Sequence, residues 1–435
     1  MEKYYRFFRD PVHGFIPVTK AESEIIDTWP FQRLRRIKQL GMTYLVYHGA
    51  EHTRFGHSLG VMHQASRVFD ALVNKNQAML GWPDDKIDRL KQLLRLASLC
   101  HDLGHCPFSH AGEGEGEADE KLLADHLRHE DYSAKIVLAK EGRAGEIRQV
   151  IEGRAGELHN VTPEEIAALV KEEALGESAF LQQILSGELD ADRMDYLQRD
   201  SIYCGVRYGR FDNDRLIETL TVSREPVSEN FVIAIEEDGV PAAEGLILAR
   251  YSMFLQVYFH RVRRAYDYHL RTFLKSALGA TGCYPGPEDL DSFLAFDDQK
   301  VCRMFEEYSE RGGKAGEHAT RIVKRNHYRV AKQTSQVASQ HQITKWDSQL
   351  FPQVKDRFPG AVANDRPETA AQRFEELPKE FPVVPKEPSS RVKAIEDASA
   401  LIPRLQALTI RRLLADKEKC DDVRRFCESL NLDVS

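Results

Sequence analysis

The adjacent pair His101-Asp102, in the segment LASLCHDLGHCPFSH (96–110), is the feature of the sequence with the clearest chemical meaning. An imidazole nitrogen and a carboxylate oxygen together bind hard or borderline divalent metals. The pair lies in a histidine-rich region, because nine of the 16 His fall within residues 48–129, less than a fifth of the chain. These residues predict a metal or phosphate site that needs further ligands from other segments.

Two further residues are candidate ligands of the same ion. His57 begins a predicted helix in HTRFGHSLG (52–60), and Asp192 lies in the carboxylate-rich segment LDADRMDYLQRDS (189–201). Each also has a structural alternative, because His57 could cap its helix and Asp192 could cap a helix or pair with Arg193. The residues alone leave both interpretations open.

The neighbours of these candidates favour phosphate-ester chemistry. His105 follows His101 by four residues, which places both on one face if the helix continues, and Arg54 precedes His57 by about one turn. An arginine binds phosphate oxygens as a fork, a metal polarises them or activates water, and a histidine transfers the proton. No GxxxxGK[ST] loop occurs, so a P-loop is not expected.

The elements that must position these residues are mostly helices. The segments GHSLGVMHQASRVFDALV (56–73) and DRLKQLLRLASLCH (88–101) carry apolar residues at helical spacing, and Gly104 and Pro107 end the second helix. The segment NFVIAIEEDGV (230–240) is typical of a strand and turn. We therefore expect a mainly α fold, with a helical core, a small β-hairpin and a helical C-terminal lobe.

The character of the sequence changes near residue 280. The segment LPKEFPVVPKEPS (377–389) carries four Pro and predicts an extended connector, and an amphipathic pattern over 391–430 predicts one or two closing helices. The candidate site residues all come earlier. We predict a catalytic core over residues 1–280 and a helical or regulatory C-terminal lobe over residues 281–435.

Composition restricts the class of protein. The chain has 435 residues, with 60 Lys and Arg against 68 Asp and Glu, so its net charge of −8 gives no global basis for wrapping DNA. No apolar run approaches the ~18–20 residues of a membrane span, and the N-terminus lacks the apolar stretch of a signal peptide. The seven Cys include no CxxC and suit a reducing compartment. We expect a cytoplasmic protein without membrane contact.

Seven segments follow one another in an order that a known family shares. They cover most of residues 1–275 and are DPVHGFIPV (10–18), IIDTWPFQRLRRIKQLG (25–41), HTRFGHSLGVMHQA (52–65), LASLCHDLGHCPFSH (96–110), RHE (128–130), DADRMDYLQRDSIYCGV (190–206) and VYFHRVRRAYDYH (257–269). With these segments the chain resembles the HD-domain phosphohydrolases. Among them it is similar to the dGTPase-like deoxynucleoside triphosphate (dNTP) triphosphohydrolases and their animal relative with a sterile-alpha-motif domain. The match begins almost at once, so no counterpart of that extra domain is expected.

The resemblance implies a metal site and a reaction. His57, His101, Asp102 and Asp192 correspond to the four ligands of a divalent metal, for which Mn, Mg, Fe, Zn and Ni are all compatible. The implied reaction is hydrolysis at the α-phosphorus of a dNTP, which releases a deoxynucleoside and inorganic triphosphate. The HD core of this family is helical, in agreement with the expected fold.

The resemblance also implies catalytic residues around the metal. His105 and His129 correspond to a pair near the α-phosphate, one of which protonates the leaving 5′-oxygen of the nucleoside. Glu113 stands at the position of an Asp that orients the catalytic His in the family. His110 is interpreted as a supporting polar residue rather than a ligand.

Further polar side chains correspond to substrate contacts of the family. Gln39 matches a residue that reads the deoxyribose 3′-hydroxyl, and Tyr196 and Asp200 match the segment that borders the phosphates and sugar. Cations suit the strongly negative triphosphate group. The three arginines that match family positions near the phosphates are Arg54, Arg193 and Arg264.

The resemblance extends to regulation and assembly. Asp27 and Arg35 match positions that read guanine in an activator site, which predicts activation by GTP or a dNTP in a homo-oligomer (dimer, tetramer or hexamer). Alternatively, Asp27 caps a helix and Arg35 is one of several basic helix residues. The basic pair Lys324-Arg325 leaves nucleic acid as a weakly supported partner, against a solvated helix face.

Two other functions stay open at the level of sequence. One is a different HD phosphohydrolase, which acts on a nucleoside monophosphate or a cyclic nucleotide. The other is a regulatory protein that senses nucleotides or binds nucleic acid. Gln39 and the DADRMDY segment (190–196) favour a triphosphate substrate, and the intact set of four ligands favours an enzyme over a sensor.

Overall fold

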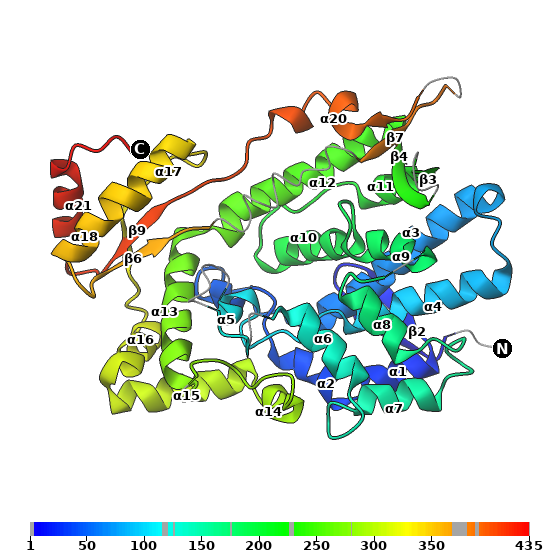
Figure 1. Cartoon of the computed structure of the whole chain (residues 1–435), viewed down its shortest axis with the longest axis horizontal. Helices are drawn as coiled ribbons and strands as arrows, with labels where there is room; N and C mark the ends of the chain where they lie inside the picture. Colours follow the sequence, from blue (N-terminus) through cyan, green and yellow to red (C-terminus); the bar gives the residue numbers. More distant parts are fainter. Residues whose placement is uncertain are drawn as a thin grey trace.

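The computed structural model of the chain describes residues 4–114, 121–124, 127–174, 176–225, 230–279, 281–367, 381–387 and 391–434. Helices make up most of these residues, and short strands lie at three places around them (Figure 1). The predicted mainly α fold is confirmed.

An antiparallel β-hairpin precedes the helices. Strand β1 (Arg6–Asp10) pairs with β2 (Gly14–Val18), with Arg9 opposite Phe15. Side chains alternate between the two faces of a strand, so Ile16 is buried against the helices while Phe15 is 57% exposed. The hairpin is thus fixed to the helical core along its inner face.

Three helices form the part of the core that carries the predicted site. Helix α3 (Arg54–Leu80) ends at Gly81, whose φ of 60° is the left-handed conformation that glycine adopts readily. Helix α4 (Asp84–Cys100) returns antiparallel to it, and α10 (Ala191–Tyr203) begins at Asp190, whose carboxylate accepts the backbone N–H of Arg193. All three helices pack in one large apolar core.

Shorter helices surround these three. They cover the sides of the core and connect its segments. They are α1 (Lys20–Ile26), α2 (Trp29–Arg33), α5 (His110–Glu113), α6 (His129–Leu138), α7 (Glu146–Gly153), α8 (Pro163–Val170), α9 (Glu177–Ser186) and α11 (Asn213–Thr219).

The strand predicted over residues 230–240 is present as β4 (Phe231–Glu236). It pairs antiparallel with β3 (Leu220–Arg224), and its other edge pairs in parallel with β7 (Pro382–Val384), which pairs in turn with β8 (Lys393–Ala394). Of the predicted connector over residues 377–389, residues 377–380 and 388–389 lie outside the described residues. Its described part therefore includes a sheet strand and is not purely a linker.

A long helical stretch follows β4 and is interrupted once. Helix α12 (Val240–Met253) continues into a π-helical turn (Phe254–Tyr258), and α13 (Arg261–Ala277) starts after His260. Helices α14 (Leu290–Leu294), α15 (Asp298–Arg311) and α16 (Gly313–Val323) come next, and α16 packs with both α13 and α15. The apolar core therefore continues past residue 280, and the predicted domain boundary stays a prediction.

The remainder of the C-terminal lobe contains a small sheet that the sequence did not predict. Strand β9 (Arg412–Ala415) lies between β5 (Arg329–Gln333) and β6 (Val362–Asp365), antiparallel to both. One face of the sheet packs on its own apolar cluster, and the other faces α13. After α16, the described part of this lobe contains the α-helices α17 (Gln340–Lys345), α18 (Phe351–Arg357), α20 (Ile395–Ala398) and α21 (Cys420–Ser429).

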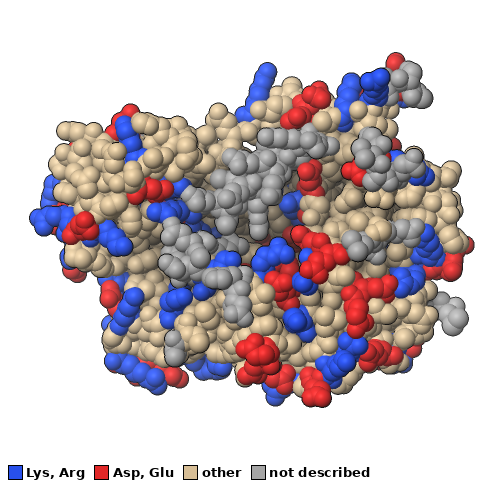
Figure 2. All heavy atoms as spheres, viewed as in Figure 1, with Lys and Arg blue, Asp and Glu red and all other residues tan. Residues whose placement is uncertain are grey.

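The described helices include none that combines the length and the apolar character of a membrane span. Acidic and basic side chains of the described residues are interspersed on the face shown in Figure 2. Arg325 donates from Nη2 to the backbone carbonyl of Leu45 at 2.9 Å. Contact with nucleic acid through Lys324-Arg325 stays a prediction.

Candidate metal centre

Three helices bring the four predicted metal ligands together. His57 lies in the first turn of α3, His101 and Asp102 follow the last residue of α4, and Asp192 lies in the first turn of α10. Nε2 of His57 lies 2.9 Å from Oδ1 of Asp192 and 3.6 Å from Oδ2 of Asp102. Nε2 of His101 lies 3.2 Å from Oδ1 of Asp102 and 3.8 Å from Oδ1 of Asp192. We call these four side chains the metal cluster.

The electrostatics of the metal cluster favour a positive charge at its centre. Burial lowers the pKa of His57, but Asp192 and Asp195 outweigh burial and raise it to about 10. Burial raises the pKa of Asp192, but His101 and His57 outweigh it, so the net pKa is lowered. Carboxylates that hold a proton on a buried imidazole hold a bound cation by the same attraction.

The chemistry of the side chains fits a divalent metal. Nδ1 of His101 lies 2.8 Å from the carbonyl of Ser98, which assigns the proton to Nδ1 and leaves the lone pair on Nε2. That Nε2 is buried and makes no hydrogen bond among the described residues. Ligand atoms of His57, His101 and Asp192 all lie within 4.8 Å of one another. The structure therefore contains a site with suitable ligands, and the prediction of a divalent-metal cofactor is confirmed.

Arg54 lies beside the metal cluster, one turn before His57 on α3. It donates from Nη1 to Oδ2 of Asp102 at 2.7 Å and from Nε to the hydroxyl of Ser109 at 2.7 Å. Burial raises the pKa of Asp102, but Arg54 and the nearby imidazoles bring it well below its usual value. The carboxylate of Asp102 is therefore ionised. It bonds the guanidinium of Arg54 and is at the same time one of the predicted metal ligands.

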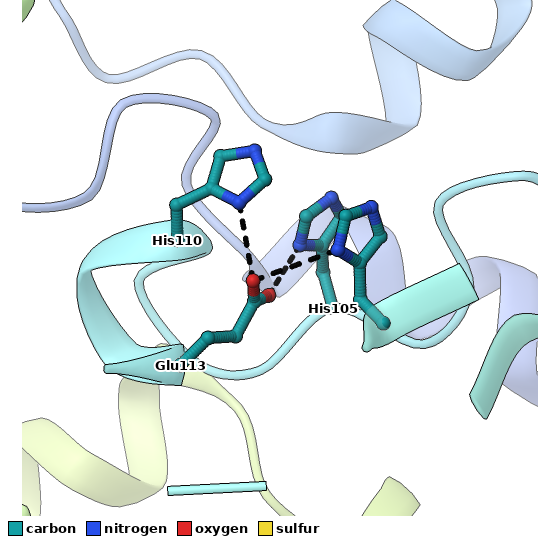
Figure 3. A group of neighbouring side chains, drawn as sticks. His105, His110 and Glu113 are labelled. Atoms are coloured by element: carbon teal, nitrogen blue, oxygen red, sulfur yellow. Dashed lines mark hydrogen bonds and ion pairs between the residues drawn. The ribbon is translucent and has the colours of Figure 1, made fainter. Parts of the chain in front are cut away.

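A second group of imidazoles gathers on one carboxylate next to the metal cluster. Nδ1 of His105 lies 2.5 Å from Oε1 of Glu113, and Nδ1 of His110 lies 3.1 Å from its Oε2 (Figure 3). Nδ1 of His129 lies 3.6 Å from the same Oε2, and the His129 ring stacks on that of His105 at 3.7 Å. We call these four side chains the Glu113 cluster.

The Glu113 cluster touches the metal cluster at one point. Nε2 of His105 lies 3.1 Å from Oδ1 of Asp102. Burial raises the pKa of Glu113, but His105, His129 and His110 outweigh burial and hold it well below its usual value. An ionised Glu113 accepts the Nδ1 proton of His105, so Nε2 of that ring faces the metal cluster.

Two family models match the chain in succession. The model of the HD domain matches residues 54–200, and the model of the HD associated region matches residues 211–358. The first match begins at Arg54, ends at Asp200 and contains both clusters. The chain therefore contains an HD domain followed by an HD associated region.

Several curated proteins are similar to the HD-domain part of the chain. An uncharacterized protein of Bacillus subtilis, YwfO, is 39% identical over 273 residues, which are 62% of this chain and 56% of that protein. A Dictyostelium discoideum protein named deoxynucleoside triphosphate triphosphohydrolase SAMHD1 homolog is 30% identical over 308 residues, 69% of this chain and 55% of that protein. The chain spans about half the length of the curated relatives it matches.

Solved structures match nearly the whole chain. A hypothetical protein from Aquifex aeolicus is 31% identical, with a TM-score of 0.76, and the match covers 97% of this chain and 99% of that one. A phosphohydrolase from Bacteroides thetaiotaomicron is 25% identical, with a TM-score of 0.71, and the match covers 95% and 100%. The C-terminal lobe therefore recurs with the HD domain in these proteins.

Asp195 contacts His57 in the HD domain, and sequence reasoning did not single it out. Its Oδ2 lies 2.7 Å from Nδ1 of His57, and its Oδ1 lies 2.6 Å from Nε2 of His13. Arg199 donates to both oxygens of Asp195 at 2.8 and 2.9 Å. Because Asp195 holds Nδ1 of His57, Nε2 is the nitrogen that a metal can bind. The sequence contained one sign of its importance, because Asp195 follows the predicted ligand Asp192 by three residues in the same motif.

Three of the residues predicted to bind the sugar and phosphates are connected through His52 and Tyr258. Asp200 lies with Oδ1 2.8 Å from Nε2 of His52 and accepts the hydroxyl of Tyr258 at 2.7 Å. The Tyr258 ring is 6.2 Å from that of Tyr196, and the backbone N–H of Gln39 donates to the His52 carbonyl at 3.0 Å. Oε1 of Gln39 is buried and makes no hydrogen bond among the described residues. The amide of Gln39 can therefore accept a bond from a ligand.

Two arginines predicted to bind phosphate have protein partners instead. Nη1 of Arg193 lies 3.0 Å from Oδ2 of Asp190, the residue that caps α10. Arg264 donates from Nε to Oδ1 of Asp365 at 2.8 Å, which connects α13 with strand β6. The phosphate-binding roles of both arginines stay predictions.

The predicted activator residues lie near the β-hairpin. Oδ1 of Asp27 lies 3.4 Å from Nη1 of Arg6. Asp27 is also the C-cap of α1, which agrees with the alternative interpretation that it caps a helix. The guanidinium of Arg35 lies 3.4 Å from the centre of the Phe55 ring. Activator binding by Asp27 and Arg35 stays a prediction.

Proposed function

We propose that the protein is a metal-dependent phosphohydrolase that converts a dNTP into a deoxynucleoside and inorganic triphosphate. The observation that carries the proposal is that Arg54 and His105 meet on Asp102, a member of the metal cluster. Arg54 bonds Oδ2 at 2.7 Å, and Nε2 of His105 lies 3.1 Å from Oδ1. A phosphate-binding cation and a proton-transferring imidazole therefore share one contact beside the metal ligands.

Each of these side chains has a chemical task in the proposed reaction. A divalent ion held by the metal cluster would supply Lewis acidity and an activated water. Arg54 binds phosphate oxygens through its forked guanidinium. Burial lowers the pKa of His105 to about 4, so its Nε2 is free to take a proton from the attacking water and to pass it to the leaving 5′-oxygen. Glu113 orients His105, and His129 stacks on it and limits its rotation.

Two observations support a dNTP rather than another phosphate ester. The Dictyostelium relative bears the name of a deoxynucleoside triphosphate triphosphohydrolase. In this chain, the buried Oε1 of Gln39 has no partner among the described residues, so it can accept a bond from the sugar 3′-hydroxyl. Tyr196 and Asp200 lie in the same region and would border the sugar and phosphates.

A product assay tests the proposal. The purified protein is incubated with each dNTP and NTP and with Mn, Mg, Fe, Zn or Ni, and products are separated by chromatography. Deoxynucleoside plus inorganic triphosphate is the expected result. Release of pyrophosphate and a monophosphate would contradict it, and turnover of a nucleoside monophosphate or cyclic nucleotide alone would assign the protein to another branch of HD phosphohydrolases. Absence of turnover with every metal would favour a nucleotide sensor.

Regulation and assembly form a second part of the proposal. Activation by GTP or a dNTP, through Asp27 and Arg35 in a cytoplasmic homo-oligomer, is supported by the family resemblance. Adding dGTP or GTP to a dATP assay, with the molecular mass measured by light scattering, tests both ideas. A rate and a mass that do not change with any nucleotide would contradict the activator role.

A further inference from the structure

A carboxylate of the C-terminal lobe bonds two loops of the catalytic core predicted over residues 1–280. Asp298, the first residue of α15, accepts the backbone N–H of Lys38 at 2.9 Å through Oδ2 and that of Phe108 at 2.7 Å through Oδ1. Lys38 precedes Gln39, and Phe108 lies between His105 and His110. One side chain therefore fixes two segments of the candidate site.

The two loops meet again at Ser109, next to the metal cluster. The hydroxyl of Ser109 donates to the carbonyl of Lys38 at 2.6 Å and accepts from Nε of Arg54 at 2.7 Å. Arg54 in turn bonds Asp102. A continuous chain of hydrogen bonds thus runs from Asp298 to the cation that we expect to bind phosphate.

The backbone at this point requires an external restraint. Phe108 and Ser109 have φ angles of 62° and 55°, in the left-handed region that residues with a side chain rarely adopt. Both are buried, and a Cβ on Gly41 would lie 2.7 Å from the carbonyl oxygen of Phe108. Such conformations persist where the surroundings hold them, and they gather at functional sites.

The buried carboxyl group of Asp298 is unfavourable for the stability of the fold. It is 5% exposed, and burial raises the pKa of its carboxyl to about 7, although the two N–H groups, Lys38 and Arg33 act in the opposite direction. A buried carboxylate with a raised pKa destabilises the folded state in comparison with an apolar residue. The bonds from Asp298 to the backbone N–H groups of Lys38 and Phe108 explain why a carboxylate is present at this buried position.

We propose that Asp298 is a positioning residue. From the C-terminal lobe it fixes the Lys38 and Phe108–Ser109 segments, so that Ser109 directs Arg54 to the phosphate position beside the metal cluster. The role of Arg54 rests on the proposed function, whereas the restraint on the two loops does not. The alternative is that Asp298 only stabilises the N-terminus of α15.

Two variants and a neighbouring control separate these roles. Asp298→Ala removes both acceptors, and Asp298→Asn keeps one oxygen acceptor and the size of the side chain. The control is Asp297→Ser, because Asp297 caps α15 by accepting the N–H of Lys300 at 2.8 Å and pairs with Arg36 at 2.6 Å. Serine keeps the cap and loses the ion pair, without a contact to Lys38 or Phe108.

The readouts are amide hydrogen exchange, binding of inorganic triphosphate to the metal-loaded protein, and kcat and KM for a dNTP. Asp298→Ala should speed exchange at residues 34–45 and 104–112 together, and weaken triphosphate binding and kcat/KM about tenfold or more. Metal content should not change. Asp298→Asn should lie between wild type and Asp298→Ala, and Asp297→Ser should stay within about twofold of wild type.

Several results would overturn the positioning role. Unchanged exchange at both segments in Asp298→Ala would do so, as would faster exchange with wild-type triphosphate affinity. An equal loss of triphosphate binding in Asp297→Ser would show that both variants act only by destabilising α15. If Asp298→Ala does not fold, Asp298→Asn decides alone. If wild type hydrolyses no nucleotide, the proposed function fails, while exchange and triphosphate binding still decide the role of Asp298.

Discussion

The two clusters of the HD domain use the same residue types in opposite proportions. The metal cluster has two imidazoles and two carboxylates from three helices, whereas the Glu113 cluster has three imidazoles around one carboxylate, all within residues 105–129. Two carboxylates attract a cation, and a single carboxylate shared by three imidazoles leaves them suited to face an anion or move a proton. The metal cluster therefore offers a cation one carboxylate more than the Glu113 cluster does.

The largest effect should follow a change in the metal cluster. Asp192→Ala removes a carboxylate that contacts both imidazoles, so we expect loss of bound metal and a fall in activity of at least about a hundredfold. Metal content by mass spectrometry and a dNTP assay measure this. The matched control is Asp214→Ala, since Asp214 pairs with Arg67 at the surface. Full activity of Asp192→Ala would disprove the ligand assignment.

The Glu113 cluster should respond in rate and not in metal content. Glu113→Gln keeps the shape but turns one oxygen acceptor into a donor, so it cannot hold His105 and His110 together. We expect kcat to fall about a hundredfold, the size of an acid–base contribution, with metal binding unchanged. Loss of metal in this variant would mean that the two clusters act as one unit.

Asp195 links the metal cluster to the rest of the HD domain, and its effect should be intermediate. Asp195→Asn weakens the hold on Nδ1 of His57 and leaves Arg199 with Asp10 as its remaining charge partner. We expect metal affinity to fall about tenfold, measured by titration with a chelator, as for other groups that orient a metal-bound histidine. An unchanged affinity would assign Asp195 to stability alone.

The smallest effect is expected at the edge of the Glu113 cluster. The side chain of His110 is 36% exposed, and its bond to Glu113 is the longer of the two. His110→Gln should lower kcat about threefold, which corresponds to one ordinary hydrogen bond. A loss equal to that of Glu113→Gln would make His110 a catalytic residue and His105 the supporting one.

Local sequence patterns predicted the parts of the fold that depend on local physics. The helical period of residues 56–73 and 88–101 led to α3 and α4, and the family motifs led to residues that the structure brings together. The network behind them was not predictable, because His13 lies 182 residues from Asp195 and Lys38 lies 260 residues from Asp298. Strands β5, β6 and β9 were missed for the same reason, since each is short and its partner is distant.

The N-terminal hairpin has a practical consequence for anyone who shortens this protein. Its turn supplies His13 to Asp195, and Asp10 accepts Nη1 of Arg199 at 2.8 Å. Removal of residues 1–18 would take away none of the four metal ligands. It would nevertheless withdraw two of the groups that keep Asp195, and through it His57, in place. The metal content of any shortened and purified version of the chain should therefore be measured before a loss of its activity is interpreted.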